Sequence, residues 1–132
     1  MSGSTNLLLL FNHTPTAAQD EDARRSLGVE EIIHLPEFLR SVWNSVPPDA
    51  EKIYGYLEPI RSWVLEASRS GDYLLIQGDF GASYLMVKFA FEQGLIPVYS
   101  TTERDAVEEI TEDGAVRLSH RFRHVRFRRY GE

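Results

Sequence analysis

Cysteine is absent from this chain of 132 residues. Its absence excludes disulfide bonds, thiolate metal sites and cysteine nucleophiles, and it is compatible with a reducing cytoplasm. Long apolar runs are missing as well. The run Leu7–Phe11 is too short for a membrane span or for the core of a signal peptide, and no charged n-region precedes it. We therefore expect a cytoplasmic protein that does not associate with a membrane.

Motifs for cofactors and metals are missing too. No Gly-x-Gly-x-x-Gly follows the first predicted strand, which argues against a dinucleotide cofactor. The four histidines lack the spacing of a zinc site, and no cluster of carboxylates suggests a pair of magnesium ions. We expect no cofactor and no metal, so that any catalysis would be metal-independent.

Charge is distributed unevenly along the chain. The net charge is −6, yet residues 117–132 hold six arginines and one glutamate and contribute +5, so the remaining residues carry −11. A chain this acidic should not bind duplex nucleic acid indiscriminately, because such binding needs many phosphate contacts. The arginine strip could hold a small polyanion, form a dimer contact or be a solvated sheet face.

The length and the 42% hydrophobic content fit one globular domain spanning residues 1–132. Strands and helices alternate, which predicts an α/β fold with a mostly parallel sheet and right-handed crossovers. The predicted strands are 6–13, 29–35, 73–77 and 95–100. The predicted helices are 16–27, 36–46, 50–68 and 82–93, with Pro59 kinking or splitting the third.

The end of the chain has a different pattern. Residues 105–110, a turn at Thr111–Gly114 and the segment from Ala115 onward predict an antiparallel β-hairpin, with a helix over 103–110 as the competing interpretation. In the last strand the apolar positions alternate through Phe122 and then shift by one residue. This shift predicts a bulge near Arg123-His124.

The stretch from Tyr73 to Ala82 is the most informative one. A buried strand runs into Gln77 and then into Gly78-Asp79-Phe80-Gly81, which leads onto a helix N-terminus. Two other predicted strands also end in polar residues, Asn12-His13 and Ser100–Arg104. Because the carboxyl ends of parallel strands share one edge of a sheet, we expect a ligand site there.

Three residues are candidates for chemistry at this edge. His13 could act as a base or offset phosphoryl charge, Asn12 could hold an attacking hydroxyl, and Asp79 could orient a ribose. Each also has an ordinary structural explanation: a strand-end histidine packed on a loop, asparagine in a turn, and aspartate as a helix cap.

Further residues at the same edge are candidates for binding a ligand. Phe80 could stack on a base or simply staple the helix, while Thr101 and Thr102 could contact phosphate or act as caps. The candidate ligand-binding residues are Phe11, Thr14, Gln77, Gly78, Phe80, Gly81, Ala82, Thr101, Thr102 and Arg104.

Several segments together resemble one known family, the small stand-alone CRISPR-associated ring nucleases, which are related to CRISPR-associated Rossmann-fold sensor domains. The resemblance spans nearly the whole chain. The segments that carry it are residues 8–13 (LLLFNH), 27–33 (LGVEEII), 71–82 (GDYLLIQGDFGA), 94–102 (GLIPVYSTT) and 122–130 (FRHVRFRRY).

The resemblance implies a Rossmann-like three-layer fold and a homodimer that binds cyclic oligoadenylate, most simply the four-membered ring, across a two-fold axis. It also implies metal-independent cleavage of that ring to linear products, which would end type III CRISPR signalling. The family has no shared catalytic set, so the residues above remain inferences from position. Two alternatives stay open: a module that binds or sequesters the ring without cleaving it, and a single-stranded RNA nuclease or binder using the arginine strip.

Overall fold

A mixed five-stranded sheet organises the computed structural model, which describes residues 4–132. The strand order is β2-β1-β3-β4-β5. β2, β1, β3 and β4 are parallel, and β5 runs antiparallel to β4. The strands span β1 Asn6–Leu10, β2 Glu31–Ile33, β3 Tyr73–Ile76, β4 Ile96–Ile110 and β5 Val116–Arg129. The predicted α/β class, the mostly parallel sheet and the C-terminal hairpin are confirmed.

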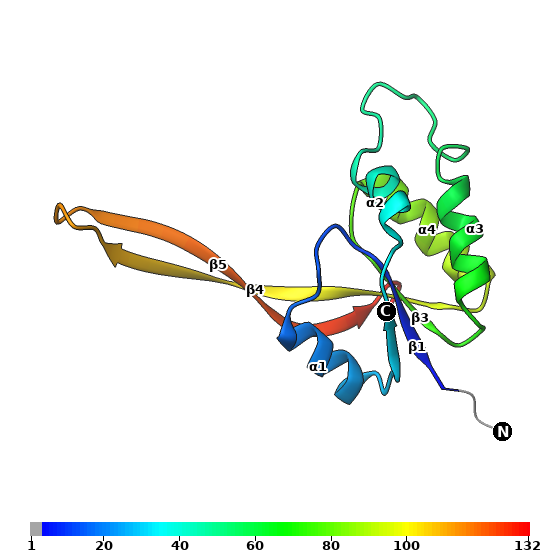
Figure 1. Cartoon of the computed structure of the whole chain (residues 1–132), viewed down its shortest axis with the longest axis horizontal. Helices are drawn as coiled ribbons and strands as arrows, with labels where there is room; N and C mark the ends of the chain where they lie inside the picture. Colours follow the sequence, from blue (N-terminus) through cyan, green and yellow to red (C-terminus); the bar gives the residue numbers. More distant parts are fainter. Residues whose placement is uncertain (1–3) are drawn as a thin grey trace.

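Helices lie on both sides of the sheet (Figure 1). They span α1 Ala17–Ser26, α2 Glu37–Asn44, α3 Glu58–Ala67 and α4 Phe80–Glu92. Because side chains alternate along a strand, Leu8 and Leu10 pack with α2, α3 and α4, whereas Leu7 and Leu9 pack with α1. The continuous apolar run of β1 is thus explained by burial on both faces.

Most predicted elements are present with shifted ends, and one prediction is wrong. No continuous helix covers residues 50–68: the segment before Leu57 is turn and loop, and α3 starts at Glu58 with Pro59 in its first turn. A proline in the first turn removes only an N–H that would lack a helical partner, so it begins a helix here and does not kink one. Similarly, α4 starts at Phe80 and not at residue 82.

The fourth strand is much longer than predicted. β4 continues past Ser100 to Ile110, so residues 103–110 are strand and the competing helix is wrong. The turn at 111–114 brings the chain back with Gly114 at a φ of +81°, a value that favours glycine. The pairing register shifts between Thr101 and Thr102, opposite Arg126 and His124, so Val125 is the extra residue of the predicted bulge.

Beyond the bulge the hairpin leaves the body of the molecule. Residues 102–124, here called the arm, form a two-stranded ribbon that extends well away from the helices (Figure 1). The core residues all belong to the remainder of the chain, here called the body. An isolated two-stranded ribbon is only marginally stable in water, so the arm needs either support at its base or a partner along its length.

Candidate functional site

The carboxyl ends of β1 and β3 form a switch point in the sheet. The two strands are neighbours, and the backbone N–H of Gln77 donates to the carbonyl of Leu10 at 3.0 Å. The chain after β1 enters α1 on one face, whereas the chain after β3 enters α4 on the other. In open α/β sheets such a divergence opens a crevice in which ligands bind.

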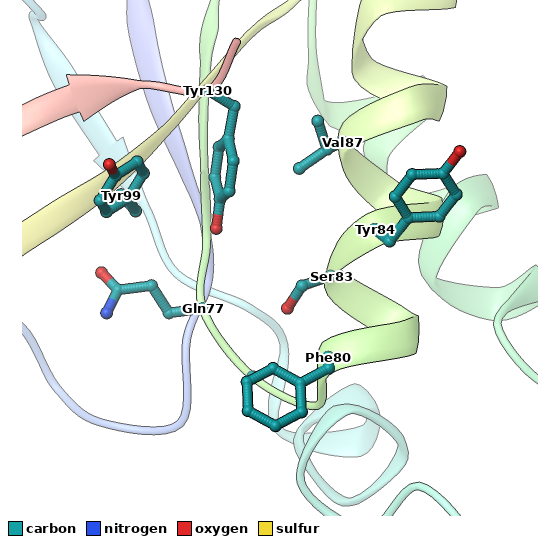
Figure 2. A pocket seen from close by; sticks show the side chains of 8 residues that line it. Gln77, Phe80, Ser83, Tyr84, Val87, Tyr99 and Tyr130 are labelled. Carbon is teal, nitrogen blue, oxygen red and sulfur yellow. The ribbon is translucent and has the colours of Figure 1, made fainter. Parts of the chain in front are cut away.

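A hollow of about 500 Å³ lies on the α4 side of this edge. Its lining residues are Gln77, Gly78, Phe80, Ser83, Tyr84, Val87, Tyr99 and Tyr130. Ser83 and Val87 point from α4 toward Tyr130, and Phe80 stands at the mouth (Figure 2). The volume and the mixture of aromatic and polar groups are those of a small-molecule site.

Two tyrosines form the wall opposite α4. The rings of Tyr99 and Tyr130 lie 4.8 Å apart, and the Tyr130 hydroxyl donates to the carbonyl of Ile76 at 2.5 Å. Desolvation, with the nearby Tyr99, raises the pKa of Tyr130, so its hydroxyl stays protonated at neutral pH. Arg128 donates to the Tyr99 hydroxyl at 3.0 Å and places a positive charge beside the hollow.

Ser83 has a hydroxyl without a partner inside the hollow. Its Oγ is buried and makes no hydrogen bond to the described residues. An unpaired buried hydroxyl costs free energy unless a ligand or water completes it. Phe80 is the opposite case, because its ring is 95% exposed although it is large and apolar. A planar, partly polar ligand would satisfy both side chains.

The turn after β3 is held by Trp43 of α2. The Trp43 indole N–H donates to the carbonyl of Gln77 at 3.0 Å, and the indole ring is almost completely buried. A Cβ on Gly78 would lie 2.8 Å from that ring, so only glycine fits against it. The Gln77 side chain accepts from the Ser100 N–H at 2.8 Å and ties β3 to β4. These contacts fix the floor of the hollow.

Asp79 acts as a helix cap, which is the structural alternative to orienting a ribose. Its carboxylate accepts from the Ala82 N–H at 3.0 Å and caps α4. The cap already places negative charge at the helix N-terminus, so an uncharged base or ribose suits the Gly78–Ala82 turn better than a phosphate does. Gly81 and Ala82 lie in the first turn of α4, and Ala82 is fully buried.

The residues after β1 lie at the same edge but outside the hollow. Phe11 packs with the core on the α1 side, and the His13 ring meets it edge-on with centroids 5.4 Å apart. Asn12, His13 and Thr14 are exposed. The structure therefore brings Gln77, Gly78 and Phe80 together in one hollow, and places the β1 candidates on the neighbouring loop.

The remaining candidates lie at the base of the arm. The Thr101 hydroxyl pairs with the backbone of Arg126 across the hairpin, which is the ordinary role of a strand threonine. Thr102 and Arg104 are exposed on the arm. None of the three lines the hollow. They lie beyond the sheet edge because β4 continues where a strand ending at Ser100 was expected.

A buried polar network at the bulge was not predicted. Gln19 donates to the Ser100 hydroxyl at 3.3 Å, this hydroxyl lies 2.5 Å from His124 Nδ1, and His124 Nε2 lies 2.7 Å from Asp22. Both ring nitrogens of His124 therefore have a hydrogen-bond partner. The order of groups is that of a serine-histidine-aspartate triad, but Ser100 is only 6% exposed and closed off by Gln19. The network anchors the arm to α1.

Five residues of the hollow were missed: Ser83, Tyr84, Val87, Tyr99 and Tyr130. The first three lie within about one turn of α4, and their spacing does not show what they face. Tyr99 lies on β4, and Tyr130 comes beside it because β5 pairs with β4. Pairing between distant segments leaves no local signal in a sequence.

Residues 4–132 contain neither a membrane-spanning helix nor a cluster of metal ligands. No helix in that range combines the length and apolar composition needed to cross a membrane. No group of three or more His, Cys, Asp or Glu side chains in the described part of the chain is placed to hold a metal ion.

Comparison with known proteins gives one family. Residues 5–128 match the model of a family described as "Uncharacterized protein MJ1673 family". The protein MJ1673 of Methanocaldococcus jannaschii is 47% identical over 124 residues, which cover 94% of this chain and 95% of that protein. No solved structure matches the chain. The family match includes β1, the turn after β3, α4 and the whole arm.

Proposed function

The chain belongs to the uncharacterized protein MJ1673 family, and we propose that it binds a cyclic oligoadenylate at the hollow beside β3 and cleaves the ring without a metal. In this proposal the protein is a homodimeric, cytoplasmic ring nuclease that ends type III CRISPR signalling, and its sheet and helices form a Rossmann-like three-layer fold. The ligand is most simply the ring of four adenylates. The hollow is the observation that carries the proposal.

The chemistry of the hollow suits a nucleoside. Adenine can stack on Phe80 at the mouth, and the aromatic wall of Tyr99 and Tyr130 offers further apolar contact. The Ser83 hydroxyl is buried and unpaired, so it would become a partner for the base edge only if its side chain rotated toward the hollow. Arg128, held beside Tyr99, supplies positive charge for a phosphate where the capped helix N-terminus does not.

The ring is larger than one nucleoside and would continue across the sheet edge toward the β1 loop. Adjacent strands lie about 4.8 Å apart, so a nucleotide linked to the seated one reaches Asn12 and His13. There the ribose 2′-oxygen attacks its own 3′-phosphate, the bond to the 5′-oxygen breaks, and a 2′,3′-cyclic phosphate forms. His13 takes the proton from the 2′-OH, the leaving 5′-oxygen gains one from water, and Asn12 holds the hydroxyl in line.

The alternative is a module that binds the ring without cleaving it. The exposure of His13 favours this alternative, because the described part of the chain supplies no hydrogen bond that orients the imidazole. A general base is usually oriented by a third group.

One experiment separates enzyme from binding module. The protein is incubated with cyclic tetra-adenylate in EDTA and the products are resolved by chromatography. We expect linear products ending in a 2′,3′-cyclic phosphate. Recovery of intact ring bound to excess protein would establish the binding module instead, and absence of both binding and cleavage would contradict the proposal.

The His13→Ala variant tests the role of the β1 loop. We expect cleavage to slow by about 10²-fold or more while the dissociation constant for the ring changes less than about threefold. His34→Ala, which removes an exposed histidine that follows β2 and has no role in the proposed site, is the matched control and should retain most activity. Equal losses of binding and cleavage in His13→Ala would assign His13 to binding alone.

A further inference from the structure

The arm has one apolar and one charged face. Paired residues of a hairpin point to the same side, and the side alternates along each strand. One face carries Ala106, Ile110, Val116, Leu118 and Phe122 together with Arg104, Glu108 and His120. The other carries ion pairs of Arg121 with Glu109 and of Arg123 with Glu103 and Asp105. Charged residues cover one side of the ribbon, whereas the apolar side is open.

The open face is too apolar to be an ordinary solvated surface. Leu118 is 59% exposed, Val116 66%, Phe122 69% and Ile110 82%. They share the face with Arg104, Glu108 and His120, and a group of exposed apolar side chains of this kind favours an interaction site. A ribbon of two strands gains stability when a second layer covers its apolar face.

We propose that the apolar faces of two arms pack against each other in antiparallel orientation, so that the arms form the interface of a homodimer. Charge symmetry within the face carries this proposal. Arg104 and Glu108 lie on the apolar face at equal distances on either side of Ala106. A two-fold axis crossing the arms at Ala106 places Arg104 of each copy over Glu108 of the other.

The same axis matches the apolar residues. Phe122 pairs with Arg104 across the hairpin and Leu118 pairs with Glu108, so Phe122 of one copy meets Leu118 of the other. At the axis itself, Ala106 of one copy meets Ala106 of the other, and His120 meets His120. A parallel arrangement would place Glu108 against Leu118 and leave its carboxylate without a partner, at a cost in desolvation. The chain therefore favours the antiparallel pair.

The base of the arm offers a receiving surface for the partner's tip. In the antiparallel pair the layer of Ile110 and Val116 lies over the partner's layer of Thr102 and His124. A hollow of about 190 Å³ lies near that position, between α1 and the bulge, and is lined by Ala18, Glu21, Asp22, Arg25, His124 and Val125. Ile110 and Val116 of each arm would contact Ala18 and Val125 there, beside the charged side chains of α1.

This inference goes beyond the proposed function and does not depend on it. The interface leaves the hollow beside β3 free and places the two bodies at opposite ends of the paired arms. Each body would then bind its own ring, in contrast to the sequence-based expectation of one ring across the two-fold axis. Association is therefore measured without nucleotide, so that failure of ligand binding leaves the result on the arm unaffected.

Sedimentation equilibrium of the full chain tests the interface. We expect the wild type to be a dimer, Leu118→Glu to be a folded monomer, and Val107→Glu to remain a dimer. Val107 is the matched control, because it is an apolar residue of the same arm on the charged face. Circular dichroism verifies folding. A monomeric wild type, or equal effects of the two variants, would overturn the proposal.

A charge swap tests the antiparallel register. Arg104 and Glu108 lie about 13 Å apart on one strand, so they do not pair within a copy. Arg104→Glu and Glu108→Arg should each raise the dimer dissociation constant several-fold, up to about tenfold, because each creates two like-charge contacts. The double variant should restore the wild-type value. A double variant that associates as weakly as the single variants would overturn the antiparallel arrangement.

Discussion

Phe80 is the clearest link between one side chain and a ligand. A phenylalanine that is 95% exposed at the mouth of a hollow gains nothing from its position in the free protein. Stacking a base on an aromatic ring is worth about 1–3 kcal/mol. The physical role of this residue is thus completed only when something planar covers it.

We predict that Phe80→Ala weakens binding of cyclic tetra-adenylate by about 5- to 150-fold, as that stacking energy requires. Binding is measured by isothermal titration calorimetry. Phe91→Ala is the matched control, since Phe91 is an exposed phenylalanine of the same helix that does not line the hollow. Equal affinities of Phe80→Ala and wild type would remove the hollow from the binding site.

Gly78 is required for a steric reason. A methyl group there would meet the buried Trp43 ring at 2.8 Å, and either the turn or the indole would have to move. We predict that Gly78→Ala lowers the free energy of unfolding by about 1–3 kcal/mol and also weakens ring binding, because the turn forms the floor of the hollow.

Urea unfolding with fluorescence detection measures this change. Gly55→Ala is the control: a Cβ at Gly55 meets nothing within 4 Å, so the free energy of unfolding should change by less than about 0.5 kcal/mol. Unchanged stability of Gly78→Ala would show that the indole shifts without cost.

The contact between α1 and the base of the arm includes the ionisable side chain of Asp22, which bonds to His124. Burial disfavours the Asp22 carboxylate, but hydrogen bonds from Ser26 and His124 and the positive charges of His124 and Arg25 outweigh it, so the pKa of Asp22 is lowered. A lowered folded-state pKa stabilises the fold above the unfolded pKa, and the contribution is lost as the pH falls through the folded value.

We therefore predict that Asp22→Asn lowers the free energy of unfolding by about 1–2 kcal/mol at pH 7, and that the difference from wild type shrinks below about pH 4. Urea unfolding at pH 7 and pH 3 measures both differences. Asp20→Asn, an exposed neighbour paired with Arg24, is the control and should have a smaller effect at both values. A difference that does not change with pH would contradict the role of the charge.

Helices and strands that are marked by a pattern within their own segment could be predicted from the sequence. Features that depend on contacts between separate segments could not. The apolar run located β1 and the alternation of strands and helices located α1, both to within a few residues. Residues 101–110 of β4 lacked such a signal, because their mixture of charged and apolar residues is compatible with a strand and with a helix. The predicted sheet edge was therefore found at β1 and β3, while the tyrosine wall of the hollow was missed.

At the scale of the whole molecule the body and the arm are separable. The core residues lie outside residues 102–124, and the arm meets the body through the network at its base. Thr102 and His124 are paired, so a two-residue Asn-Gly turn can replace residues 103–123 while this pair and the network remain.

We predict that this shortened chain folds with a thermal midpoint within about 5 °C of the wild type, is monomeric, and binds cyclic tetra-adenylate with unchanged affinity, because the hollow beside β3 belongs to the body. Calorimetry, sedimentation and titration measure the three properties separately. A folded monomer that no longer binds the ring would mean that the ligand lies between two copies, whereas a shortened chain that still dimerises would move the interface from the arm to the body.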